Sequence, residues 1–305
     1  MKKNLIFFVL GFVSLIASFV IFSCEKPASV TPISGEDEER SYIELFHSID
    51  TYDASFQEKL PYETRASWGN FWKIIKGGLK VIGADIAGGL SGASLGGELD
   101  KGSGGHTCEI SFGIVGAVAA SAAKAIEEFQ TNDTIPKLPV DQPKSFSSNE
   151  TGSIIGEAHN EIMEKLFNMY GEGEVTTISE ERLHQDVLRL TREYLGTDLE
   201  KCDNAMLQVI SQRTAEIKRS LANLSDEETV AYLRNCGYAK KEDLKLIADY
   251  LVKIQSIQDL DLRKQYISGY MKLIKKATIS ENSKRVVLEG TSTAVNSLML
   301  WERAH

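Results

Sequence analysis

Small residues recur at every fourth position between Gly77 and Ala125, and this spacing limits what the chain can fold into. They form two rows: Ala84, Gly88, Gly92 and Gly96 in the first, and Gly113, Ala117, Ser121 and Ala125 in the second. Four-residue spacing places each row on one helix face, where missing side chains let two backbones approach closely. The spacing therefore predicts a tight, glycine-rich helical hairpin over residues 66–129.

An exposed loop with scattered glycines is the alternative for residues 77–97. Glycine in a helix interior costs up to about 1 kcal/mol relative to alanine, so such helices are marginal unless other elements pack on them. An ordinary membrane span is disfavoured, because Lys80, Asp85 and Glu98 interrupt the first row and Lys124 lies in the second. We expect the hairpin to be stabilised by packing.

The C-terminal half has helical periodicity almost throughout. Apolar stripes occur at Leu244, Ile247, Ala248, Leu251 and Ile254, and at Val287, Thr291, Ala294, Leu298 and Trp301. Capping boxes at 177–180 and 225–228 indicate two helix starts. No alternating run long enough for a β-sheet stands out. The sequence predicts an all-α fold in which residues 151–305 form a multi-helix domain, with both stripes in its core.

The N-terminal residues have the layout of a bacterial secretion signal. Two lysines precede an uncharged apolar run at 5–22, and Ser23-Cys24 follows. A small residue before a cysteine resembles the lipobox of bacterial lipoproteins, although bulky Phe22 departs from it. The resemblance implies that residues 1–23 are cleaved and that Cys24 is acylated, and several acyl chains make a stable anchor. The alternative is an uncleaved transmembrane helix, since a run of this length can just span a bilayer.

Residues 24–65 predict a tether and a short helix. The stretch 25–40 is acidic, polar and punctuated by prolines, which is typical of a segment without a fixed fold. From Ser41 to Lys59, apolar residues recur at helical spacing, and Pro61 ends the pattern. Such a tether would connect a lipid anchor to a folded body.

Residues 130–150 predict a second linker or a long exposed loop, because they contain three prolines and a serine-rich run. Asp133-Thr134-Ile135, near its start, resembles the sequon at which exported Bacteroidota proteins receive O-glycans. Thr134 is therefore a candidate glycosylation site, and an unmodified threonine is the alternative.

Charge and cysteine usage restrict the partners. The formal net charge is −9, and −11 once Lys2 and Lys3 leave with the signal peptide, which argues against nucleic acid and against anionic lipid headgroups. We expect membrane contact through the N-terminal lipid and no nucleic-acid partner. A protein partner is an open alternative, and the sequence does not identify it. An oxidising compartment would permit a disulfide between Cys202 and Cys236, and two reduced, packed thiols are the alternative.

No recognisable catalytic constellation is present. Residues 92–96 fit the G-x-S-x-G pattern, but a nucleophile elbow needs a strand before the serine and a helix after it, and no α/β alternation follows. His159 lies among two carboxylates, and we interpret His159 and Asn160 as hydrogen-bonding residues at a helix junction, with a general base or ligand as the alternative. His106 and Cys108 alone do not make a zinc site. We expect no catalytic residue, no metal and no cofactor.

Three features together resemble a group of exported Bacteroidota proteins that has no established activity. They are the glycine/alanine segment at 77–125, the element Ile155-Gly156-Glu-Ala-His159-Asn160, and the C-terminal run from Ser292 to Trp301. The first also resembles glycine-zipper proteins and class II bacteriocins, although Lys80, Asp85 and the acidic balance depart from cationic bacteriocins. The resemblance implies an exported lipoprotein on a periplasmic or surface membrane face.

Two functions are compatible with these features. The first is a non-enzymatic, lipid-anchored cell-envelope protein that acts through binding or packing of its helical body. The alternative is a pore-forming or bacteriocin-like effector that inserts the hairpin at 68–129 into a membrane. Liposome leakage with and without that segment distinguishes them.

Overall fold

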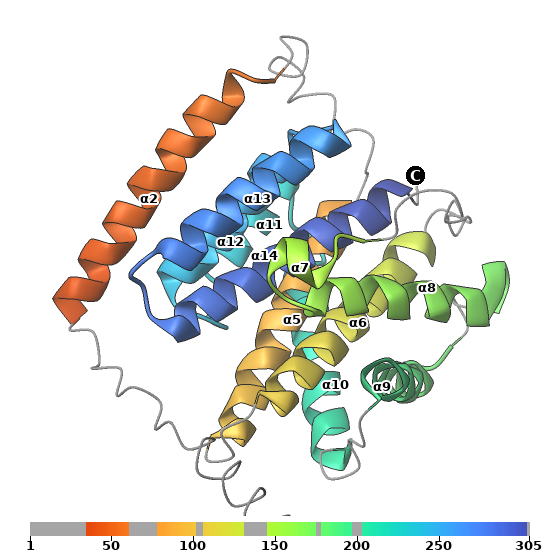
Figure 1. Ribbon diagram of the computed structural model, residues 1–305. Helices are drawn as coiled ribbons and strands as arrows, with labels where there is room; N and C mark the ends of the chain where they lie inside the picture. The colour runs from red at the N-terminus through yellow and green to blue at the C-terminus, as the bar shows by residue number, and fades with distance from the viewer. Residues whose placement is uncertain are drawn as a thin grey trace, which may run out of the picture. The chain divides into compact units, whose positions relative to one another are not determined.

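A computed structural model describes residues 35–60, 78–101, 106–130, 145–174, 178–196 and 203–303 (Figure 1). Within these ranges the chain forms eleven α-helices and no β-strand, which confirms the all-α prediction. Residues 1–38 and 39–305 form separate compact units, and of the first only the beginning of one helix is described. The predicted sites at Cys24, Thr134 and Cys202 lie outside the described residues and stay predictions.

The predicted hairpin is formed by α5 (Gly78–Asp100) and α6 (Thr107–Gln130), which pack along each other (Figure 1). A Cβ atom built at Gly92 would overlap the backbone carbonyl of Phe112, and one built at Gly88 would overlap that of Gly116. Both helices are buried on every face over 81–93 and 111–125. The glycines are therefore required for close backbone contact. Residues 78–97 are helical, so the loop alternative is wrong for them.

The first glycine row of α5 packs mainly against residues of α6 other than the predicted small ones. Backbone atoms of Cys108, Phe112 and Gly116 face it, because a helix can offer its carbonyls to a neighbour even where its side chains are large. The predicted row also contacts α5, but at Gly89 and Ala93, beside the first glycine row. Gly113 lies against Ile155 of α8, and Ala117 lies against Gly89, whereas Ser121 is fully buried near Asp85. Ala84 is buried in the hairpin.

Other helices enclose the hairpin. Those in contact with it are α8 (Ile155–Glu174), α9 (Glu180–Leu195), α10 (Asp203–Leu221), α11 (Asp226–Leu233) and α14 (Glu281–Arg303). A Cβ atom at Gly156 of α8 would overlap the carbonyl of Ser292 of α14, so these two helices also cross at backbone contact. Every residue of α14 from 289 to 301 is buried. The hairpin and α14 are therefore the centre of the fold.

The remaining helices cover α14 and confirm the predicted stripes. They are α12 (Lys241–Gln255) and α13 (Leu260–Lys276), together with the short α7 (Ser148–Thr151). All ten residues of the two apolar stripes are buried. The helix start at Ser225 has the predicted capping box with Glu228. At the start of α9 the cap is Ser179, two residues after the predicted position.

The N-terminal helix α2 (Gly35–Gln57) begins earlier than predicted, so residues 35–40 are helical and do not belong to a tether. Three acidic residues, at 36–38, occupy its first turn, where negative charge favours a helix start. Aromatic rings of its C-terminal half pack on Tyr266 of α13, which in turn stacks on Tyr250 of α12. This cluster contains Tyr52, Phe56, Tyr250, Tyr266 and Tyr270, with ring centroids 4.7–6.0 Å apart.

The end of the predicted linker belongs to the folded core. Phe146 is 2% exposed, and its backbone amide donates to Asn296 Oδ1 at 2.6 Å. Ser147 and Glu150 form a capping box at the start of α7. The described residues 145–150 are therefore not an exposed loop, because a buried aromatic ring and a helix cap fix them.

Candidate functional site

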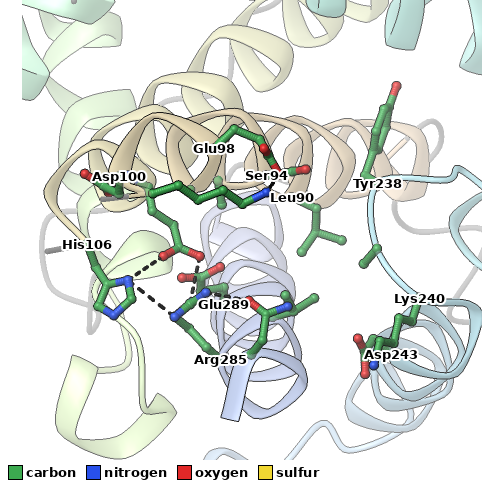
Figure 2. Close-up of a pocket in the computed structure, with 17 residues that line it drawn as sticks. Leu90, Ser94, Glu98, Asp100, His106, Tyr238, Lys240, Asp243, Arg285 and Glu289 are labelled. Atoms are coloured by element: carbon green, nitrogen blue, oxygen red, sulfur yellow. Dashed lines mark hydrogen bonds and ion pairs between the residues drawn. The ribbon is translucent and has the colours of Figure 1, made fainter. Parts of the chain in front are cut away.

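A polar pocket of about 670 Å³ opens between α5, the start of α6, the beginning of α12 and α14 (Figure 2). Its apolar surface comes from Leu90, Ala93, Ala239 and Val286. Its charged residues are Glu98, Asp100, Lys101, His106, Glu109, Lys240, Asp243, Arg285 and Glu289. A volume of this size suits a small organic molecule.

An ion pair between α14 and α6 forms one wall. Arg285 Nε donates to Glu109 Oε1 at 2.7 Å, and Arg285 Nη2 donates to Asn282 Oδ1 at 2.6 Å. His106 Nδ1 lies 2.9 Å from Glu109 Oε2 and 3.3 Å from Arg285 Nη1 (Figure 2). The charge of Arg285 is thus already matched by a carboxylate that is almost fully buried.

Glu289 lies one turn after Arg285 on α14 and has no comparable partner. The residue is 4% exposed, and its Oε2 atom has no hydrogen-bond donor. Burial and the nearby charge of Glu109 raise the pKa of Glu289 to about 8, although Arg285 opposes the shift. A buried carboxyl oxygen without a donor is costly, so the place of Glu289 at a pocket wall marks it as a candidate functional group.

Asp243, on the opposite side of the pocket, is held differently. Its Oδ1 accepts a 2.5 Å hydrogen bond from the Tyr42 hydroxyl of α2. Burial raises the pKa of Asp243 to about 6, while the bond from Tyr42 and the charge of Lys240 partly offset that increase. Asp243 is therefore ionised at neutral pH, when Glu289 is mostly protonated.

We expect the stability difference between Glu289→Gln and the wild type to depend on pH. The folded pKa of about 8 lies above the ordinary value of about 4.3, so the unfolded chain loses this proton first. Between these two pH values, ionisation of Glu289 lowers the free energy of unfolding by on the order of 1 kcal/mol per pH unit. Glutamine does not ionise, so the variant lacks this loss. Urea unfolding at about pH 5 and about pH 8 measures the difference.

The free energy of unfolding of Glu289→Gln should increase relative to that of the wild type as the pH rises. A cost of the amide group that does not depend on pH leaves this trend unchanged. Glu281→Gln is the matched control, because Glu281 is an exposed carboxylate at the start of the same helix. A stability difference for Glu289→Gln that is the same at both pH values would contradict the raised pKa.

A second polar cluster lies wholly inside the core and contains both predicted junction residues. His159 is fully buried, and its Nδ1 atom lies 2.9 Å from Asn160 Oδ1. Its Nε2 atom lies 3.5 Å from Asp85 Oδ2. That oxygen accepts hydrogen bonds from the Ser297 hydroxyl and, at 3.3 Å, from Trp301 Nε1. Burial raises the pKa of Asp85, while His159 and the hydroxyl groups oppose the shift.

This cluster joins the central helices. Asp85 belongs to α5, His159 and Asn160 to α8, and Ser297 and Trp301 to α14. Asn160 Nδ2 also donates to the Asn296 carbonyl at 2.8 Å. The three segments that carry the sequence resemblance therefore meet here. Because Asp85, His159 and Ser297 are all 0% exposed, a substrate has no access to them, and we interpret the cluster as structural.

No charged residue of the pocket stands out in the sequence as part of a functional site. Ser94 of the G-x-S-x-G pattern does line the pocket, but it lies in the interior of α5 and has no preceding strand. The sequence does contain one signal for Glu289. This residue lies next to the second apolar stripe, and an acidic residue is unusual in a buried helix. Cys236 is a free thiol, and Cys202 lies outside the described residues, so the bridge between them stays a prediction.

No protein-family model, no curated protein and no solved structure matches this chain. Among the described residues, no group of three or more His, Cys, Asp or Glu side chains is placed to hold a metal ion. The fold and the pocket together describe an all-α protein with a buried glycine-rich hairpin and a polar pocket beside it.

Proposed function

We propose that the protein is a non-enzymatic, lipid-anchored cell-envelope protein whose helical body binds a small ligand in the pocket between α5, α6, α12 and α14. The observation that carries the proposal is the buried Glu289 carboxyl group, which has an unpartnered oxygen at the wall of a cavity of about 670 Å³. Proteins keep such a destabilising group where it serves a site. Two other charged side chains of the pocket are fixed: Arg285 donates to Glu109 and Asn282, and Asp243 accepts from Tyr42. Such fixed side chains are typical of a preformed binding site.

A binding role without turnover is tested by native mass spectrometry of the full-length protein in detergent, incubated with a small-molecule extract of the host envelope. We expect a noncovalent adduct whose ligand is recovered unchanged. Ser94→Trp should abolish the adduct, because Ser94 is an exposed residue that lines the pocket, and Ser55→Trp on exposed α2 should keep it. Consumption of the compound with release of a product would indicate an enzyme instead.

The anchor part of the proposal rests on Ser23-Cys24 after the apolar run. We expect Cys24→Ser to move the protein from the membrane to the soluble fraction, because the acylated residue is lost. Cys108→Ser, which replaces a cysteine at the start of α6, should leave the protein at the membrane. A serine variant that stays membrane-bound with an unshortened mass would indicate an uncleaved helix anchor.

A pore-forming role is the second candidate, and one observation favours it. The stretch Thr107–Glu127 of α6 is long and apolar enough to cross a membrane, but 89% of its most apolar window is buried. A buried core helix meets the same criterion, and α5 carries the buried carboxylate of Asp85. Leakage of dye from liposomes at neutral pH would favour insertion; we expect none.

A further inference from the structure

We propose that the pocket binds an organic cation, an ammonium or guanidinium group on a short aliphatic stem, with its charge placed at Glu289. This inference rests on the proposed binding function and specifies its ligand class. It follows from three properties of the pocket: which charges are already matched, which surface is apolar, and how large the space is.

The charges of the pocket leave Glu289 in need of a positive partner. Arg285 is neutralised by Glu109, and Lys101 lies 2.5 Å from Glu98. Lys240, the third cation of the pocket, favours the charged form of Asp243. None of the three cations donates a hydrogen bond to Glu289 Oε2, which accepts none. A bound ammonium group would supply both a donor and the opposite charge, which is how buried carboxylates are usually stabilised.

An anionic ligand fits the site poorly. Its best partner would be Arg285, but all three nitrogens of that guanidinium group already face Glu109, Asn282 or His106. An anion would also approach the carboxylate of Asp243. A bare metal ion is disfavoured, because no cluster of three suitable ligands occurs among the described residues.

The remaining surface suits a carbon stem. Leu90 and Ala93 of α5 are nearly fully buried and line the pocket together with Val286 of α14. A volume of about 670 Å³ accommodates an organic molecule rather than a single ion. The ligand would thus place its cationic end at Glu289 and its aliphatic part against these side chains.

Binding should depend on pH through Glu289. From α5 and the start of α6, the charged or titratable groups around the pocket are Glu98, Asp100, Lys101, His106 and Glu109. From the opposite wall they are Tyr238, Lys240, Asp243 and Arg285. Asp243, with a pKa of about 6, is already ionised at pH 7, and burial raises the pKa of Tyr238 above its ordinary value. A carboxyl group with a pKa of about 8 gains most of its charge between pH 7 and pH 9.

The test uses three probes of similar shape, 5-aminopentan-1-ol, 1,5-pentanediol and 5-hydroxypentanoate, titrated calorimetrically into the full-length protein in detergent. We expect the amino alcohol to bind and the diol and the acid to bind at least about tenfold more weakly. Its affinity should rise about tenfold from pH 7 to pH 9. Heats in buffers of different ionisation enthalpy should show about one proton released per cation bound at pH 7.

Glu289→Gln should weaken binding of the amino alcohol at least about tenfold and abolish both its pH dependence and the proton release. Glu281→Gln should change none of them. Equal binding of the amino alcohol and the diol, preferred binding of the acid, or unchanged binding by Glu289→Gln would each overturn the cation assignment while leaving the pocket a binding site. If no probe binds, the cation assignment fails, and the envelope-extract experiment decides the binding function separately.

Discussion

Gly92→Leu is expected to lower the free energy of unfolding by about 3 kcal/mol or more, because its side chain must enter a seam without space for a single methyl group. A Cβ atom at Gly92 would already overlap the carbonyl carbon and oxygen of Phe112. Backbone cannot move aside as a flexible side chain can, so α5 and α6 would have to separate along the centre of the fold. Urea unfolding followed by circular dichroism measures the loss.

Gly97 provides the matched control on the same helix. A Cβ atom at this position would lie 3.7 Å from the Glu109 Cδ atom, which is ordinary van der Waals contact. Gly97→Ala should therefore be neutral or stabilise the protein by up to about 1 kcal/mol, because alanine favours the helix. Gly92→Ala should already be destabilising. Equal stability of the two alanine variants would contradict the close packing of the hairpin.

Asp85→Ala is expected to destabilise the protein by about 3 kcal/mol, because it removes the acceptor from two buried donors on α14. The Ser297 hydroxyl and the Trp301 indole both donate to Asp85 Oδ2. Asp85→Asn keeps the shape and one carbonyl acceptor, so it should cost clearly less. Thermal and urea unfolding compare both variants with the wild type.

Glu98→Ala serves as the control for this prediction. Glu98 is an acidic residue of the same helix, but its side chain is 64% exposed and pairs only with exposed Lys101. Its removal should change stability by no more than about 0.5 kcal/mol. If Asp85→Ala were as mild as Glu98→Ala, the buried cluster would not join the central helices as we describe.

Periodicity predicts the helices well and their contacts less well. The glycine spacing at 88, 92 and 96 predicts the seam on α5, since absent side chains are visible in a sequence. The matching surface of α6 is not visible, because Phe112 contributes its carbonyl rather than its side chain. The sequence likewise predicts a linker at Phe146, which is buried in the structure, because one aromatic residue among serines and prolines gives no periodic signal.

The pocket could not be predicted, because packing of separate helices brings its groups together. Arg285 and Glu289 are four residues apart, a spacing that predicts an ordinary pair on one helix. In the structure Arg285 instead pairs with Glu109, which is 176 positions away in the chain, and Glu289 Oε2 is left without a donor. Asp243 is held by Tyr42, a still more distant residue. Only the tertiary structure determines which carboxyl group stays unmatched.

The most direct test of a cation site at Glu289 is the titration of its own carboxyl group. In protein with carbon-13 in the glutamate side chains, NMR follows each carboxyl carbon, and the resonance absent from Glu289→Gln identifies this one. We predict a midpoint at a pH of about 8 in the protein alone and a clear fall when 5-aminopentan-1-ol is added, since a bound cation favours the charged form. A midpoint near the ordinary value of about 4.3, or one that the amino alcohol leaves unchanged, would contradict a cation site at Glu289.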